Sequence, residues 1–158
     1  MNPDGILKLY IGTAKTQRSD AKNFRQLNRS VSKIYDDQLR PYGLTISQFI
    51  ILVAIANIGE ASPQIIGSTL NLEKSTLSRG LERMIKKEWL EASYSEGGRV
   101  QTISLTEAGT RQILEASHSW SKAQEQVEQL IKHNDISALF NMTRSINEQQ
   151  VFFNRPFA

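Results

Sequence analysis

Hydroxyl and basic side chains gather on one face of a helix predicted over residues 74–88. Its other face is apolar, at about 100° per residue, and comprises Leu77, Leu81, Met84 and Ile85. Ser75, Thr76 and Ser78 are short enough to let a helix backbone enter the major groove of DNA. Arg79 can then reach a guanine edge or a phosphate. The face therefore suits the chemistry of binding a polyanion.

A glycine-rich turn with an arginine follows this helix. Residues 91–95 and 100–105 are typical of two short strands, and Glu96, Gly97, Gly98 and Arg99 separate them. In such a hairpin, glycines bring the backbone near the sugar-phosphate chain, and Arg99 extends into the negative potential of a narrow minor groove. The predicted DNA-contacting residues are Lys74, Ser75, Thr76, Ser78, Arg79, Arg83 and Arg99. Lys86 and Lys87 extend the same basic side.

The sequence contains no evident catalytic or metal-ligating constellation. Cysteine is absent, which excludes disulfides, thiolate metal sites and cysteine nucleophiles. His118 and His133 lack the spacing of zinc ligands and are expected at the surface. Asp36 and Asp37 are neighbours on a helix, so their carboxylates diverge, and residues 73–76 lack the glycine that precedes the lysine of a phosphate-binding loop. We expect no enzyme activity, no cofactor and no metal.

An amphipathic helix is predicted over about residues 19–39. Its apolar stripe recurs at steps of three and four residues and comprises Phe24, Leu27, Val31 and Ile34. Pro41 and Gly43 end this helix. Thr45 and Gln48 then match a capping box, and residues 49–56 after them are apolar on every side. We therefore expect the second helix to be buried.

Three further helices are predicted besides those over residues 74–88, over residues 19–39 and after Thr45. Ser62 before Pro63 predicts the start of a short one. Thr106 suits the cap of a long helix after the hairpin. Its near-heptad apolar stripe comprises Ile113, Ala116, Trp120, Ala123, Val127, Leu130 and Ile131. Asn134 or Asp135 is expected to cap the last helix.

The order of these elements predicts a mainly α fold with a small β-hairpin wing. A winged helix-turn-helix core would be flanked by N- and C-terminal helices. The composition, with 39% hydrophobic and 22% charged residues, agrees with one globular domain, and the net charge of +3 permits a polyanionic partner without requiring one. The longest apolar run, residues 49–56, is too short for a membrane span, and the N-terminus lacks the pattern of a secretion signal. We therefore expect a cytoplasmic protein with no membrane partner.

The sequence resembles the MarR family of bacterial transcriptional regulators from about Asp20 onward. Four stretches carry the resemblance, with the sequences PYGLT, LEKSTLSR, MIKKEWL and LTEAG at residues 41–45, 72–79, 84–90 and 105–109. Each is weak alone, but their order and spacing together are specific. The resemblance implies a homodimer built from the terminal helices, with two recognition helices in successive major grooves of double-stranded DNA. It also implies control of transcription by a small ligand.

The resemblance implies three regions and a ligand site. Residues 1–44 would form an N-terminal dimerisation arm, residues 45–106 the DNA-binding core and residues 107–158 the C-terminal dimerisation helices. Apolar stripes at residues 113–131 and 136–153 exceed what the middle core can cover, which favours a homodimer and a pseudo-palindromic operator. MarR-like proteins bind aromatic ligands where the terminal helices meet the core. The residues that would line or fill such a cleft here are Tyr35, Tyr42, Phe49 and Trp120.

Several departures from the family pattern concern DNA contact. The wing commonly carries Asp-Arg-Arg, whereas residues 97–99 here are Gly-Gly-Arg, in a hairpin about two residues shorter, with Glu96 as a substitute acid. Glu73 stands where a serine or aspartate cap is usual, and Trp89 where glycine is common. The alternative function is therefore a winged-helix module that binds another protein, as an antirepressor or heterodimer partner. The basic residues of the helix and the wing favour DNA.

Overall fold

The computed structural model describes residues 20–153. Residues 1–19 and 154–158, which the sequence assigned to the terminal arms, lie outside the described residues. The elements in chain order are α2 (Asp20–Leu39), the 3-10 turn η1 (Arg40–Tyr42), α3 (Ile46–Ile58), α4 (Pro63–Leu70), α5 (Lys74–Lys86), β1 (Leu90–Tyr94), β2 (Val100–Leu105), α6 (Glu107–Leu130) and α7 (His133–Phe153). The predicted class, mainly α with one β-hairpin, is confirmed.

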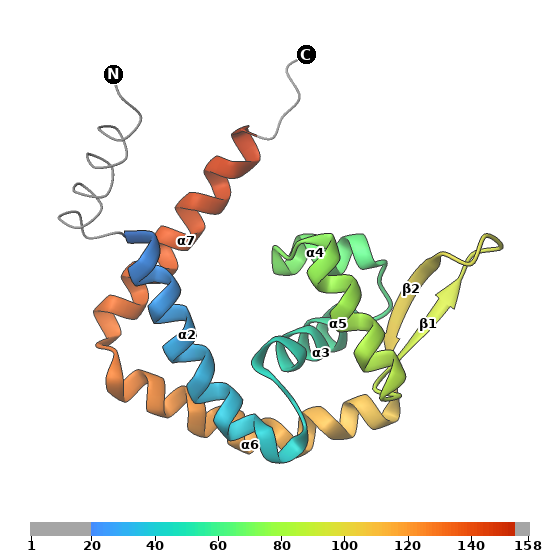
Figure 1. Cartoon of the computed structure of the whole chain (residues 1–158), viewed down its shortest axis with the longest axis horizontal. Coiled ribbons are helices and arrows are strands. Elements are labelled where there is room, and N and C mark those ends of the chain that lie inside the picture. The colour runs from blue at the N-terminus through green and yellow to red at the C-terminus, as the bar shows by residue number, and fades with distance from the viewer. Residues whose placement is uncertain (1–19, 154–158) are drawn as a thin grey trace, which may run out of the picture.

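The long helix α6 joins the two ends of the molecule (Figure 1). At one end α2 and α7 rise from it, and at the other end lie α3, α4, α5 and the hairpin (Figure 1). The C-terminal half of the chain therefore begins beside the wing and ends far from it. This arrangement separates the terminal helices from the winged helix-turn-helix elements.

Local capping explains where most helices begin. The Thr45 hydroxyl accepts the amide of Gln48, whose side chain accepts the amide of Thr45, so the predicted capping box is confirmed. Ser62 caps α4 ahead of Pro63, and Thr106 caps α6, both as predicted. Each cap satisfies amides that the first turn of a helix leaves without an intrahelical partner.

The predicted cap of the last helix is wrong, because α7 begins at His133 rather than after Asn134 or Asp135. The carbonyl oxygen of Lys132 accepts the amides of Asp135 and Ile136, at 2.9 and 3.2 Å. The first turn thus closes through the backbone at Lys132, two residues before Asn134 and three before Asp135. A side-chain pattern does not reveal a start of this kind.

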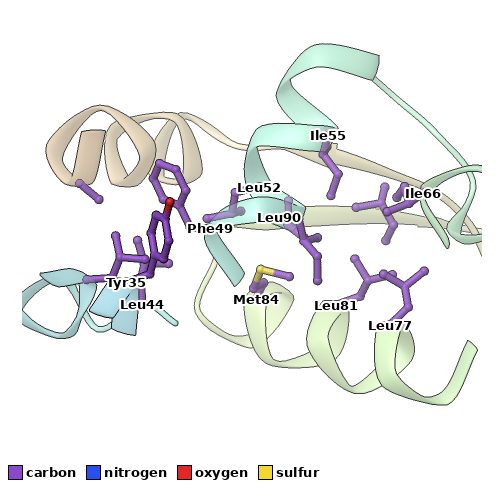
Figure 2. Packing of buried hydrophobic residues seen from close by; sticks show 14 of the residues in the cluster. Tyr35, Leu44, Phe49, Leu52, Ile55, Ile66, Leu77, Leu81, Met84 and Leu90 are labelled. Atoms are coloured by element: carbon purple, nitrogen blue, oxygen red, sulfur yellow. The ribbon is translucent and has the colours of Figure 1, made fainter. Parts of the chain in front are cut away.

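The core runs without a break from α2 through the winged helix-turn-helix to α6. In Figure 2, Leu77, Leu81 and Met84 of α5 point toward the side chains of α3, α4 and β1, while Tyr35, Leu44 and Phe49 lie at the other end of the cluster. The largest fully buried side chains are Leu39, Leu52, Ile55, Ile66, Met84, Leu90 and Ile103. Burial of α2 residues in this cluster joins the N-terminal helix to the winged helix-turn-helix.

Two burial expectations need correction. Helix α3 is not buried all round, because Ile50 and Ile58 remain 39% and 38% exposed on a side that no element of residues 20–153 covers. The α6 stripe is mostly used within the chain, since Ala116, Ala123 and Val127 are buried and α6 packs on α2 and α3. Leu130, at the end of that stripe, is 68% exposed. Within residues 113–131, the large apolar side chains that remain exposed are Leu114 and Leu130.

Among residues 20–153, no single helix is long and apolar enough to cross a membrane. The segments Ala21–Tyr42 and Ile46–Ile58 meet that test only as a pair bent by 76°. The second of these segments is α3, whose buried residues belong to the core.

Candidate DNA-binding surface

Helix α5 divides into a buried face and an exposed polar face. Leu77, Leu81 and Met84 are buried, as predicted, and Ile85 is half-buried. The predicted DNA-contacting residues on the other side are all exposed, and are Lys74, Ser75, Thr76, Ser78, Arg79 and Arg83. Arg79 lies almost directly opposite the buried face, by the 100° step of a helix. The structure thus brings these six residues to one surface.

The cations on this surface are available to a ligand. The Arg79 Nε donates to the carbonyl oxygen of Ser75, at 3.1 Å, one turn back along α5. This bond leaves the two Nη groups of Arg79 as donors. The side chains of Lys74, Arg83 and Lys86 make no hydrogen bond or ion pair within residues 20–153.

Close helix contacts fix the position of α5. A Cβ on Gly67 of α4 would lie 3.3 Å from Leu77 Cδ2, and a Cβ on Gly80 would lie 3.3 Å from Ile51 Cδ1 of α3. The turn between α4 and α5 uses Asn71 in the left-handed conformation, at φ 51°. These glycines let α5 pack deeply on its buried side, which leaves its polar side as the outer surface of the helix-turn-helix.

The end of α5 is anchored to two other elements. Lys87 Nζ donates to the carbonyl oxygen of Gly43, at 2.8 Å, and lies 4.2 Å from the centre of the Trp89 ring. The Thr106 hydroxyl donates to the carbonyl oxygen of Glu88, at 2.7 Å. Lys87 therefore does not belong to the free basic surface, contrary to the prediction, because its ammonium group binds the turn after η1.

The left-handed position after α5 is Glu88, not Trp89. Glu88 has φ 59°, whereas the family pattern places the missing glycine at Trp89. Close by, a Cβ on Gly109 of α6 would collide with the Trp89 carbonyl oxygen. Sequence reasoning missed the roles of Lys87 and Gly109. The glycine in the stretch LTEAG was the available signal for a close backbone contact.

The wing is a short hairpin with a three-residue turn. The Gly98 amide donates to the Ser95 carbonyl oxygen at 2.8 Å, and Gly98 has φ 71°, as a type I turn with a glycine bulge requires. Strand β1 begins at Leu90, one residue before the prediction. Arg99 is exposed at the base of the turn. It forms no ion pair with Glu96, so the substitute acid does not hold it.

The wing is fixed to the segment before α4. Ala61 and Ile103 exchange backbone hydrogen bonds of 3.0 and 2.8 Å, which add a one-residue bridge to the antiparallel pair β1–β2. The Thr102 hydroxyl bonds the Ser93 hydroxyl at 2.6 Å and also donates to Glu60. These bonds set the orientation of the wing relative to the helix-turn-helix.

The four aromatic residues predicted at a ligand cleft form a packed cluster with one outlying member. The Trp120 ring centre lies 4.6 Å from both Tyr35 and Phe49, stacked on Phe49 and tilted on Tyr35. Tyr35 donates to Gln124 Oε1 at 2.7 Å, and burial, then the charge of Glu128, raises the pKa of its hydroxyl. Tyr42 makes no ring contact with them and accepts from Ser119 at 3.2 Å. Three of the four rings thus fill space against one another.

No group of three or more His, Asp or Glu side chains within residues 20–153 is placed to hold a metal ion. Asp36 and Asp37 diverge as predicted. Asp36 accepts the amide of Ile46 at 2.7 Å, whereas Asp37 pairs with Lys33 at 2.7 Å and with Arg40. Hydrogen bonding from Lys33 is the main cause that lowers the pKa of Asp37. His118 is exposed as expected, and the side chain of His133 lies outside the described part.

Comparison with known proteins identifies the family. A model of the MarR family matches residues 42–99, from the end of η1 to the wing. The transcriptional regulator SarZ of Staphylococcus epidermidis is 32% identical over 102 residues, which cover 64% of this chain and 69% of SarZ. The chain belongs to the MarR family. The HTH-type transcriptional regulator YwoH of Bacillus subtilis is 27% identical over 127 residues, which cover 78% of this chain and 93% of YwoH.

Solved MarR-type structures share the fold. The organohalide-sensing regulator RdhR, in its ligand-free form, has a TM-score of 0.76 and is 17% identical, covering 91% of this chain and 92% of its own. A cysteine-to-serine mutant of Escherichia coli MarR, complexed with operator DNA, has a TM-score of 0.69 at 17% identity, covering 80% and 91%. As a MarR-family member, this protein is a transcriptional regulator with a winged helix, and not an enzyme.

Proposed function

We propose that this MarR-family regulator binds a pseudo-palindromic operator as a homodimer, through α5 in the major groove and Arg99 in the minor groove. The exposed basic face of α5, directly opposite its buried face, carries this proposal. An operator-bound MarR among the structural relatives supports it. Since two-fold symmetry places two copies of α5 on one face of DNA, the half-sites should lie about 10 base pairs apart.

Unpartnered apolar side chains on the terminal helices support the dimer. Phe24 near the start of α2 is 54% exposed and Phe140 of α7 is 69% exposed. The other exposed apolar side chains on these helices are Leu27, Met142 and Ile146. Helix α7 contributes no buried residue to the core of residues 20–153. Surfaces of this kind mark protein interfaces, and a second copy of the chain supplies an identical face under two-fold symmetry.

A small aromatic ligand is proposed to act on the aromatic cluster of Tyr35, Phe49 and Trp120. RdhR binds 2,4-dichlorophenol, and Bordetella bronchiseptica BpsR, another structural relative, is regulated in its DNA binding by 6-hydroxynicotinic acid. Because the Trp120 ring is in contact with both Tyr35 and Phe49, a ligand would have to displace one of these rings. Calorimetric titration with aromatic acids, with and without saturating operator, tests this. Linkage requires that ligand and DNA reduce one another's affinity by the same factor.

The decisive experiment is selection of bound duplexes from random DNA by the purified protein, followed by Arg79→Ala. An enriched inverted repeat is expected, and Arg79→Ala should cost about 1–3 kcal/mol and relax one position of each half-site. Arg99→Ala should weaken binding mainly through A·T-rich flanks. Lys122→Ala, on exposed α6, is the control. If the protein is a repressor, it lowers transcription of a reporter that carries the selected operator. If the selection enriches no sequence, the result favours the protein-binding alternative.

A further inference from the structure

One acidic side chain lies within the basic face of α5. Glu82 is exposed, three residues after Arg79, next to Arg83 and four residues before Lys86. Helix geometry places it about 60° around the axis from Arg79 and about 4.5 Å further along. It therefore belongs to the surface that the proposed function turns toward DNA.

Glu82 is not used to stabilise the helix. A glutamate four residues before a lysine is the favoured orientation for an ion pair on a helix, yet Glu82 forms no ion pair or hydrogen bond within residues 20–153. Such pairs do form elsewhere in the chain, where Lys33 and Asp37 lie 2.7 Å apart. The carboxylate is thus free on a surface where every other charged side chain is a cation.

A free carboxylate at a DNA interface needs a hydrogen-bond donor, and the base edges of the major groove offer two, cytosine N4 and adenine N6. Phosphates and the acceptor atoms of guanine and thymine repel the carboxylate. Adenine carries the acceptor N7 beside its amino group, whereas cytosine presents its N4 amino group alone, so cytosine is the favoured partner. The neighbouring cations Arg79, Arg83 and Lys86 reduce the cost of bringing this charge close to DNA. Position and chemistry together favour base reading over a purely electrostatic effect.

We propose that Glu82 accepts a hydrogen bond from cytosine N4 and so makes a C·G pair in each half-site a determinant of specificity. This inference rests on the proposed function, because it needs α5 in the major groove. Arg79 would contact a guanine or a phosphate beside that cytosine, since the two side chains lie one turn apart on the same face. The acid then discriminates among base pairs without adding to affinity for DNA in general.

The test compares the sequences selected by the wild-type chain, by Glu82→Gln and by Glu115→Gln. Glu115 is exposed on α6, so its variant makes the same change in net charge away from α5. The wild type and Glu115→Gln should enrich a C·G pair at the same position of the selected sequence. In Glu82→Gln the preference for C·G over T·A should fall by about fivefold or more, because an amide can donate to thymine O4 where a carboxylate is repelled.

Anisotropy titrations with the selected duplex and with its C·G to T·A variant confirm the change at one base pair. If Glu82→Gln keeps the same C·G preference at that position and binds every duplex more tightly, Glu82 only repels phosphates. That result would overturn this inference while a motif lost in Arg79→Ala still upheld the proposed function. Failure of the wild type to enrich any sequence would overturn both.

Discussion

Glu88 shows how one residue can hold a conformation that its side chain disfavours. Its φ of 59° lies in the left-handed region, where a residue with a Cβ costs about 1–3 kcal/mol more than in the right-handed region. The position is needed because the chain turns there from α5 into β1, through Trp89, whose amide donates to the carbonyl oxygen of Met84 at 3.0 Å. The surrounding contacts therefore maintain the turn against the preference of the residue.

Glu88→Gly should raise the free energy of unfolding by up to about 1 kcal/mol. Glycine removes the left-handed cost but loses about 0.5–1 kcal/mol in backbone entropy, so the gain is a difference of two terms. Thermal and urea unfolding measure it. Glu88→Ala is the matched control, since it removes the same charge but keeps a Cβ. Equal stabilisation by both variants would assign the effect to charge and contradict the conformational explanation.

At this scale, sequence reasoning located the exposed site residues well and the special conformations poorly. The exposed positions of α5 followed from helix periodicity, because one buried face dictates the opposite one. They are Lys74, Ser75, Thr76, Ser78, Arg79 and Arg83. The left-handed conformation of Glu88 was not predicted, since neither Glu88 nor Trp89 is the glycine that would mark such a position. The packing of Tyr35, Phe49 and Trp120 depends on three helices meeting, which no local pattern encodes.

Among the secondary-structure elements, the end of α5 is held by one lysine that joins segments far apart in the chain. Lys87 ties α5 to the turn after η1, and Lys86 beside it is free on the basic surface. The two adjacent lysines should therefore behave in opposite ways. Lys87→Met keeps an unbranched aliphatic side chain but removes the ammonium group that donates to Gly43 and lies over the Trp89 ring.

Lys87→Met should lower the free energy of unfolding by about 1 kcal/mol or less and leave the salt dependence of DNA binding unchanged. Lys86→Met should leave stability unchanged and reduce the slope of log affinity against log salt by about 0.9 for each phosphate that the protein no longer neutralises. Urea unfolding and titrations at several salt concentrations supply both measurements. A reduced salt slope in Lys87→Met would show that Lys87 binds phosphate instead.

Element boundaries were predictable where a side chain makes the cap. Thr45, Ser62 and Thr106 fixed the starts of α3, α4 and α6 because their hydroxyls bond the amides of the first turn. Helix α7 begins through the Lys132 carbonyl, so its start was misplaced. The exposure of Ile50 was missed because composition gives the apolarity of α3 but not which sides its neighbours cover.

At the scale of the whole molecule, the proposed dimer depends on the exposed apolar side chains of α2 and α7. Phe140→Glu should convert the proposed dimer to a folded monomer, because Phe140 is 69% exposed in one chain and contributes nothing to its core. Operator affinity should fall at least about tenfold, since two half-sites are no longer held together. Analytical ultracentrifugation and circular dichroism separate dissociation from unfolding. Leu114→Glu on α6, where Leu114 is 67% exposed, is the control.

A dimeric Phe140→Glu variant with wild-type operator affinity would contradict this interface. The sequence predicted two apolar stripes, at residues 113–131 and 136–153, that the core could not cover, but only part of this apolar surface is exposed in the structure. The chain buries most of the α6 stripe against α2 and α3 and leaves the α7 side chains exposed. Which stripe a chain covers by itself depends on tertiary contacts, and periodicity alone does not contain them.

A Cβ on Gly109 would collide with the Trp89 carbonyl oxygen, so the start of α6 lies directly against the backbone that follows α5. Because of this close contact, α6 and the end of α5 should move together as one rigid body. Helix α6 has 24 residues and so spans about 36 Å from its start beside this contact to its far end beside α7. Over such a length, a tilt of about 5° displaces one end by about 3 Å relative to the other. In the proposed dimer, the same tilt in both copies of α6 would double the displacement, and the distance between the two copies of α5 would no longer match one turn of the double helix.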